Sequence, residues 1–234
     1  MFATQMPLKA TLITILLISL IEAGEKIYVF YPSITRPHIA QQELQNALKG
    51  VDVFVFGRYS DFVSQVQALP PSAIITKDPL DEQFRNYHKR LSGCRGNKRS
   101  ETYVLISLGK TIDTAAINSK TVVGIVDFMG RKNIEKFAST LVHKNINVKC
   151  VLKPEDLITL LVFEMVDYVL IEESYFSYYR KIYDLDFKVS SIRFESSGII
   201  SVSVQKGKSA EKLITKLRSL KELNAHIFGI DEWM

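Results

Sequence analysis

The sequence predicts an α/β protein in which helices cover mostly parallel sheets, and three observations support this fold class. Short apolar runs rich in β-branched and aromatic residues alternate along the chain with amphipathic segments at helical spacing. Of the 234 residues, 47% are hydrophobic and 24% are charged, which suits a globular chain with a sizeable core. The run TVVGIV at residues 121–126 is almost wholly apolar, as is typical of a strand buried in a parallel sheet.

The first part of the chain predicts a β-α-β-α-β unit. The apolar runs at residues 26–31, 51–57 and 73–76 are the expected strands. Between them, Pro37 suits the first turn of one helix, and Ser60 suits the cap of a second helix that ends at a Pro-Pro pair. Strands separated by crossover helices pair in parallel, so this unit predicts a parallel sheet covered by helices.

The remainder of the chain continues the alternation of strands and helices. Helices are expected at residues 79–90, 131–143, 154–161, 175–183 and 210–220, strands at 103–108, 121–126, 147–152, 167–174, 187–194 and 199–204, and a loop at 91–101. The candidate boundaries between structural units lie near Leu108 and Val204.

The N-terminus predicts a secretory signal peptide over residues 1–23. Residues 1–9 contain one cation and no acid, and residues 10–21 (ATLITILLISLI) are uncharged and largely apolar. A dozen helical residues at about 1.5 Å each cannot cross a hydrocarbon core of roughly 30 Å. An uncleaved anchor and a buried core helix are the alternatives. If the segment directs export, the mature protein is periplasmic, secreted across the inner membrane.

Four passages carry a resemblance to a known family. They are KIYVFYPS, TYVLISLGKTIDTAAINSKTVVGIVD, VDYVLIEES and ISVSVQKGKSAEKLITKL. In order and type they resemble the type 2 periplasmic-binding proteins, and among these the phosphate and phosphonate-type binding subunits of ABC transporters. The resemblance spans roughly residues 25–234.

This resemblance implies two lobes, each a mostly parallel sheet flanked by helices, with two crossing strands as a hinge. Lobe 1 would comprise residues 24–108 and 205–234, and lobe 2 residues 109–204. It implies a monomer that captures a small polar or anionic ligand in the interlobe cleft and presents it to the permease of an ABC importer. The alternative is a periplasmic sensory or interaction module of the same fold that binds a membrane signalling protein, with or without a ligand.

Four candidate ligand-binding residues follow the expected strands of lobe 1. Tyr31 and Ser33 come after the first strand and offer a stacking face and a hydroxyl group. Thr76 and Lys77 follow the third strand, where Lys77 is placed to meet an anion. Ligands of open α/β sheets bind at the carboxyl ends of strands, which favours these positions. Each pair also suits an ordinary strand-to-helix turn, so both interpretations remain open.

The turn after residues 121–126 supplies three more candidates. Arg131, Lys132 and Asn133 begin a helix, where free backbone N–H groups and the positive end of the helix dipole favour an anion. The phosphonate-binding relatives usually present Ser or Thr hydroxyls at this turn, and this chain has none there. A different anion, or no anion, therefore remains open.

Glu173 and Tyr175 complete the expected ligand-binding set. They follow the last strand of lobe 2 before a helix, where the family often places an acid that meets a ligand amine or hydroxyl. Of the adjacent acids Glu172 and Glu173 we favour the second, although two acids before a helix are also a common N-terminal charge bias. The tyrosine-rich helix that follows suits either an aromatic pocket or core packing.

The sequence offers little support for an enzyme, a cofactor, a metal site or nucleic-acid binding. It contains no GxGxxG, Walker A or GxSxG motif, and its four histidines lie far apart without HExxH or CxxC neighbours. The net charge is +5, and the basic stretch at residues 88–99 has neither interleaved aromatics nor a recognisable module. We therefore expect a solvated loop or a contact to an acidic membrane partner there. Cys94 and Cys150 either form a disulfide or remain separate thiols.

Overall fold

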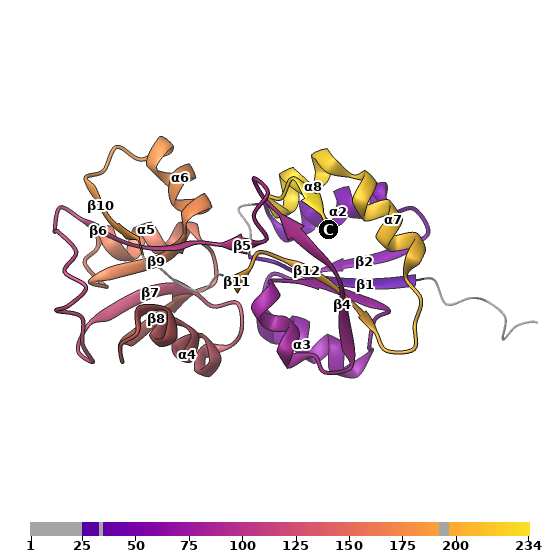
Figure 1. The fold of residues 1–234 in the computed structure, drawn as a ribbon, viewed down its shortest axis with the longest axis horizontal. Helices are drawn as coiled ribbons and strands as arrows, with labels where there is room; N and C mark the ends of the chain where they lie inside the picture. The colour runs from indigo at the N-terminus through magenta and orange to yellow at the C-terminus, as the bar shows by residue number, and fades with distance from the viewer. Residues whose placement is uncertain (1–24, 33–34, 192–196) are drawn as a thin grey trace, which may run out of the picture.

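The computed structural model describes residues 25–32, 35–191 and 197–234. The predicted signal peptide and the predicted ligand contact Ser33 lie outside these residues. The described chain forms two lobes side by side, each with its own sheet (Figure 1). Among the described residues, no helix is long and apolar enough to span a membrane.

Lobe 1 contains a six-stranded sheet in the order β13-β4-β12-β3-β1-β2. Strands β1, β2 and β3, which come first in the chain, pair in parallel as predicted. Strand β12 runs antiparallel between β3 and β4. The strands are β1 (Glu25–Phe30), β2 (Val51–Val55), β3 (Ala73–Thr76), β4 (Tyr87–Cys94), β12 (Ser201–Gln205) and β13 (Glu232–Trp233). The helices are α2 (Pro37–Ala47), α3 (Tyr59–Ala68), α7 (Glu211–Ser219), α8 (Lys221–Phe228) and the short 3-10 helix η1 (Asp78–Gln83).

The two faces of the lobe 1 sheet are covered unequally. In Figure 1, α2, α7 and α8 lie above the sheet and α3 lies below it. Alternate side chains of β1 point to opposite faces of the sheet. Ile27 and Val29 belong to the core under α2, α7 and α8, whereas Tyr28 and Phe30 pack with α3. This period of two is the expected side-chain alternation of a strand covered on both faces.

Lobe 2 contains a five-stranded sheet in the order β10-β6-β9-β7-β8. Helices α5 and α6 pack on one face and α4 on the other. The strands are β6 (Tyr103–Leu108), β7 (Val122–Val126), β8 (Asn147–Val151), β9 (Tyr168–Glu172) and β10 (Phe187–Ser191), and the helices are α4 (Arg131–Val142), α5 (Glu155–Val162) and α6 (Glu173–Ile182).

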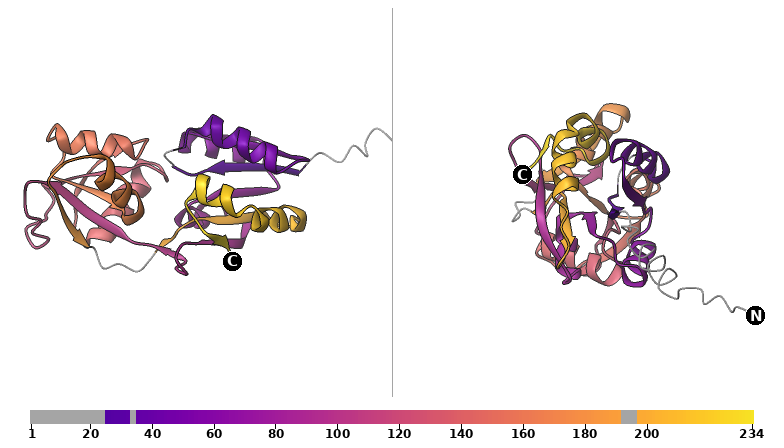
Figure 2. Two further views of the ribbon diagram at one scale, coloured as in Figure 1. Left: turned by 90° about the horizontal axis from the view of Figure 1, so that it is seen from above. Right: turned by 90° about the vertical axis from the view of Figure 1, so that its right-hand side faces the viewer.

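The two lobes are joined by a pair of short strands. Strand β5 (Ser100–Glu101) pairs antiparallel with β11 (Ser197–Gly198), and both lie between the lobes in Figures 1 and 2. The predicted boundaries at residues 108 and 204 therefore differ from the structure. Strand β6 hydrogen-bonds to β9 and β10 and belongs to lobe 2, and β12 hydrogen-bonds to β3 and β4 and belongs to lobe 1.

The segment around β4 corrects the sequence analysis most. The predicted helix at 79–90 is replaced by the six-residue 3-10 helix η1 and the start of β4, and the predicted loop at 91–101 begins inside that strand. Leu91 and Cys94 are buried, and β4 pairs with β12 on one side and β13 on the other. Pairing with two strands from the far end of the chain outweighs local helix propensity here, because buried backbone groups must be hydrogen-bonded.

The basic stretch at residues 88–99 is therefore not a solvated loop. Lys89 contacts Asp78, Arg90 donates to Glu211 at 2.6 Å, and Arg95 donates to Glu101 at 2.7 Å. These charges have partners within the chain. Cys94 of lobe 1 and Cys150 of lobe 2 are both free thiols, so the alternative of a disulfide between them is not realised.

The crossing of β4 with the C-terminal segments depends on Gly93. A Cβ atom at this position would lie 2.5 Å from Ile200 Cγ2 and 3.0 Å from Ile230 Cδ1, and both isoleucines are fully buried. We expect Gly93→Ala to lower the free energy of unfolding by about 1–3 kcal/mol through overpacking, measured by urea denaturation. Ser92→Ala, on the same strand, is the control and should change it little. A Gly93→Ala protein as stable as the wild type would contradict this packing.

Candidate functional site

The candidate site lies where two strand ends from different lobes meet. Lys77 follows β3 at the carboxyl end of the lobe 1 sheet, and Glu172 is the last residue of β9 in lobe 2. The Lys77 ammonium donates to Glu172 Oε1, and the two side chains are only 4% and 6% exposed. An ion pair across the junction is therefore buried in the protein.

Aromatic rings from both lobes surround the Lys77 ammonium. Its nitrogen lies 5.1 Å from the ring centre of Tyr31 in lobe 1 and 5.4 Å from that of Phe128 in lobe 2. The Tyr103 hydroxyl donates to Glu172 Oε1 at 3.5 Å. Both ring distances fall within the range of cation–π attraction, so the rings partly replace the water that the ammonium has lost.

The electrostatics of the junction follow from burial and from this pair. Burial opposes the charged form of Lys77, but the Glu172 carboxylate outweighs it, with help from the Tyr103 and Tyr31 hydroxyls, and raises the pKa of Lys77 above its ordinary value. Burial also raises the pKa of Tyr31 to about 12. Lys77 is accordingly charged, and Tyr31 neutral, throughout the physiological range.

The lobes touch on both rims of the junction. On one rim the Tyr175 hydroxyl of α6 donates to the Pro32 carbonyl of lobe 1 at 2.6 Å. On the other, a Cβ atom on Gly130 of lobe 2 would lie 3.0 Å from Tyr59 Cε1 of lobe 1. One hydrophobic cluster runs through the junction and includes Phe30 and Leu80 from lobe 1 and Phe128 and Leu170 from lobe 2. The structure thus shows the lobes closed on each other.

The closed junction leaves almost no free volume. The cavity beside Lys77, Glu172 and Tyr175 measures about 20 Å³. Small-molecule sites span about 300–1,000 Å³, whereas one water molecule needs roughly 10–15 Å³ of such volume. In the closed form the chain's own side chains occupy the place between the lobes.

A second ion pair lies at the hinge. Arg95 donates to Glu101 of β5 at 2.7 Å and to the Gly229 carbonyl at the end of α8. The Ser174 hydroxyl of α6 donates to the same Glu101 oxygen at 3.5 Å. Burial, and then repulsion from Glu172, raise the pKa of Glu101 to about 7, although Arg95 and Lys77 act in the opposite direction. The hinge carboxyl is thus electrostatically linked to the junction.

The predicted site residues divide into two groups. Tyr31, Lys77 and Tyr175 come together at the junction as expected. Thr76 is fully buried beside Lys77, and its hydroxyl has no hydrogen-bond partner within the described part of the chain. Glu173 is exposed, and the acid turned into the junction is its neighbour Glu172.

The predicted anion site at the start of α4 looks different in the structure. Arg131, Lys132 and Asn133 are exposed, and Arg131 pairs with Glu135 at 3.2 Å. Asp127 Oδ1 accepts the backbone N–H groups of Met129 and Gly130 at 3.2 and 2.7 Å. A carboxylate of the chain therefore already occupies two donors of this turn, which disfavours an additional anion.

Tyr103 and Phe128 are not among the predicted site residues, and Glu172 was considered but passed over in favour of Glu173. The sequence held a signal for Glu172, because it directly follows the apolar run at residues 169–171. Tyr103 begins an apolar run that predicts only core, and Phe128 lies in the turn after the expected strand at residues 121–126, where a single aromatic residue forms no recognisable pattern. Their position beside Lys77 depends on how the two lobes meet.

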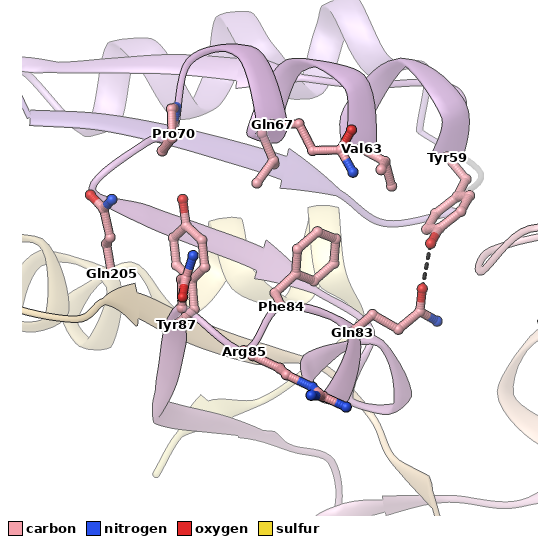
Figure 3. A pocket seen from close by; sticks show the side chains of 11 residues that line it. Tyr59, Val63, Gln67, Pro70, Gln83, Phe84, Arg85, Tyr87 and Gln205 are labelled. Atoms are coloured by element: carbon pink, nitrogen blue, oxygen red, sulfur yellow. Dashed lines mark hydrogen bonds between the residues drawn. The ribbon is translucent and has the colours of Figure 1, made fainter.

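A larger hollow of about 560 Å³ lies on lobe 1, between α3 and the turn that leads into β4 (Figure 3). The Tyr59 hydroxyl donates to Gln83 at one end of it, and the rings of Phe84 and Tyr87 line it. Among its lining residues Arg85 alone is charged, and its side chain is exposed. The junction, with two buried opposite charges, has the stronger means of selecting a polar solute.

No protein-family model matches the sequence, and no curated protein matches it either. Solved structures do share its fold. XAC2383 from Xanthomonas citri bound to ATP is 9% identical, with 90% of each chain covered and a TM-score of 0.65. A putative L-cystine ABC transporter protein from Listeria monocytogenes is 12% identical, with 89% of this chain and 97% of that chain covered and a TM-score of 0.60.

A third similar structure is a ligand-binding core. The GluR0 ligand-binding core from Nostoc punctiforme, in complex with L-glutamate, is 14% identical, with 86% of this chain and 98% of that chain covered and a TM-score of 0.57. These likenesses confirm the predicted fold class: the chain has the two-lobed α/β fold of type 2 periplasmic-binding proteins. The expectation of mostly parallel sheets was wrong, because the antiparallel pairings of β12, β4 and β13 in lobe 1 and of β6 and β10 in lobe 2 make both sheets mixed. The names of these three proteins give no support to the narrower resemblance to phosphate and phosphonate binders.

The buried ion pair predicts strong coupling between its members. Lys77→Met or Glu172→Gln alone leaves the other charge buried without its partner, which lowers the free energy of unfolding by up to about 3–5 kcal/mol. Lobe separation rehydrates that charge and reduces the loss. The double variant should be more stable than the sum of the two losses implies, by about 0.5–3 kcal/mol, in urea denaturation. Additive losses would show that the two side chains do not interact.

Glu101 predicts a pH-dependent stability. The pKa of Glu101 is raised in the folded protein, so the folded state binds a proton more tightly than the unfolded state does. The stability that this proton contributes is fully present below the ordinary pKa of 4.5 and is lost as pH rises through about 7. We expect Glu101→Gln to flatten the decline in unfolding free energy between pH 5 and 8, an effect on the order of 1–3 kcal/mol. Glu173→Gln, an exposed neighbour, is the control. Parallel pH profiles of wild type and Glu101→Gln would contradict the assignment.

Proposed function

We propose that the chain is an extracytoplasmic solute-binding protein that captures a small polar ligand between its lobes and presents it to an ABC importer. The observation that carries this proposal is the pair of opposite charges at the junction, Lys77 from lobe 1 and Glu172 from lobe 2. A ligand held by groups from both lobes stabilises the closed form, and closure gives a membrane permease a shape to recognise.

The charges favour a ligand that carries both an ammonium and an acidic group. When the lobes open, Glu172 offers a carboxylate and Lys77 an ammonium, with Tyr31, Thr76 and Tyr175 around them. Glu172 Oε2 is buried and, among the described residues, has no hydrogen-bond partner, so it is available as a second acceptor. Amino-acid-like zwitterions fit this pair better than phosphate or phosphonate, because a pure anion brings nothing to match Glu172. Similar structures bound to L-glutamate and L-arginine support the same class.

A sensory or interaction module is the second candidate function. The small junction cavity favours it, because a module that works through its closed surface needs no solute. In that case the partner is a membrane signalling protein in place of a permease.

A thermal-shift screen of the mature protein tests the proposal. The panel contains amino acids, phosphate, phosphonates and sulfonates. A true ligand at a hundred times its dissociation constant adds about 2.7 kcal/mol of stability. Glu172→Gln and Tyr31→Ala should then weaken its binding, measured by calorimetry, while the exposed control Glu173→Gln should leave it unchanged. If no solute stabilises the protein, the interaction module becomes the better description.

A further inference from the structure

We propose that Lys77 is an internal ligand: its ammonium occupies an ammonium site formed by Glu172, Tyr31 and Phe128 and holds the lobes closed without a bound solute. This inference rests on the proposed function. It adds that a side chain of the protein itself competes with the ammonium group of a ligand for the same site.

The surroundings of the Lys77 nitrogen are those of a bound primary ammonium. It has a carboxylate oxygen of Glu172 as acceptor and ring faces at 5.1 and 5.4 Å. These groups are buried in a junction that holds only about 20 Å³ of free volume. A carboxylate beside aromatic faces recognises organic ammonium groups in general.

The contact also acts across the hinge. Lys77 belongs to lobe 1, whereas Glu172 and Phe128 belong to lobe 2, so the Lys77–Glu172 pair exists only while the lobes are closed. The other contacts across the rims, Tyr175 with Pro32 and Tyr59 beside Gly130, carry no charge. Breaking the pair with the lobes closed leaves the buried Glu172 carboxylate without its cation, and opening relieves this by rehydrating the carboxylate.

A solute must therefore displace Lys77 before its own ammonium reaches Glu172. The apparent affinity is reduced by the fraction of molecules in which Lys77 has withdrawn, so weak amines are excluded. A solute that also carries an acidic group recovers the Lys77 contact, which an amine alone does not.

Chemical rescue of Lys77→Ala tests this directly. The substitution removes three methylene groups and the ammonium, which together correspond to n-propylammonium. We expect the variant to show a larger radius of gyration by small-angle X-ray scattering and a lower melting temperature. Added n-propylammonium should reverse both changes in the millimolar range, as expected for so small a ligand. The neutral n-propanol should not.

Two further variants make the rescue specific. Lys144→Ala removes an exposed lysine and should neither open the lobes nor respond to n-propylammonium. Lys77→Ala combined with Glu172→Gln should lose the rescue, because the carboxylate is gone. If Lys77→Ala fails to fold, Lys77→Met keeps the apolar stem and should still scatter as an open form.

The proposal is overturned if Lys77→Ala or Lys77→Met remains as closed as the wild type, or if n-propanol restores closure as well as n-propylammonium does. Neither readout uses a natural solute. If no solute stabilises the protein but n-propylammonium rescues Lys77→Ala, only the proposed function is contradicted. If a solute binds but the rescue fails, only the role of Lys77 as an internal ligand is contradicted.

Discussion

The ion pair between Lys77 and Glu172 is the constraint on which the arrangement of the two lobes depends. Each member is held by a strand with neighbours on both sides: β3 lies between β1 and β12, and β9 lies between β6 and β7. Central strands move little, so the two charges meet only when the sheets approach in one orientation. The hinge strands, the aromatic rings and the rim contacts all agree with that orientation.

A buried ion pair is weak evidence for stability. Removing two charges from water costs several kcal/mol per ion, and a pair of well-packed apolar side chains often does as well. An ion pair across the junction instead allows the lobes to open and close, because each charge is stable when hydrated in the open form and when paired in the closed form. The cation–π contacts of Lys77 reduce the cost of the closed form without removing the option of opening. The junction is therefore suited to switching between two states more than to maximal stability.

The sequence allowed much of the fold to be predicted, and the reasons for the errors are physical. The units of lobe 1 up to β3 and the alternation of lobe 2 depend on local periodicity, which is visible in the residues. Strand β4 depends on β12 and β13, which come from the far end of the chain, so no local pattern reveals it. The lobe boundaries shifted for the same reason, because pairing decides which sheet a strand such as β6 joins.

The candidate site shows the same division. Tyr31, Lys77 and Tyr175 were predictable because residues at strand ends converge in α/β sheets. Of the adjacent acids, Glu172 is turned into the junction and Glu173 is exposed, since neighbouring side chains at the end of a strand point in opposite directions. Tyr103 and Phe128 belong to the core by sequence and to the site only through the closure of the lobes.

If a solute binds between the lobes as we propose, the balance of charge at the junction determines which ligand class fits there. Near Lys77 lie two carboxyl groups, Glu172 and Glu101, and the pKa of Glu101 is already raised by burial and by Glu172. A phosphonate would add negative charge beside them, and pairing it with Lys77 would leave Glu172 without its cation. Arg95 is already paired with Glu101. The ammonium group of a zwitterion would take the place of the Lys77 ammonium beside Glu172. The acidic group of the same molecule would then pair with Lys77. The residues around the junction thus argue for a zwitterion more strongly than the mild positive charge of the whole chain argues for an anion.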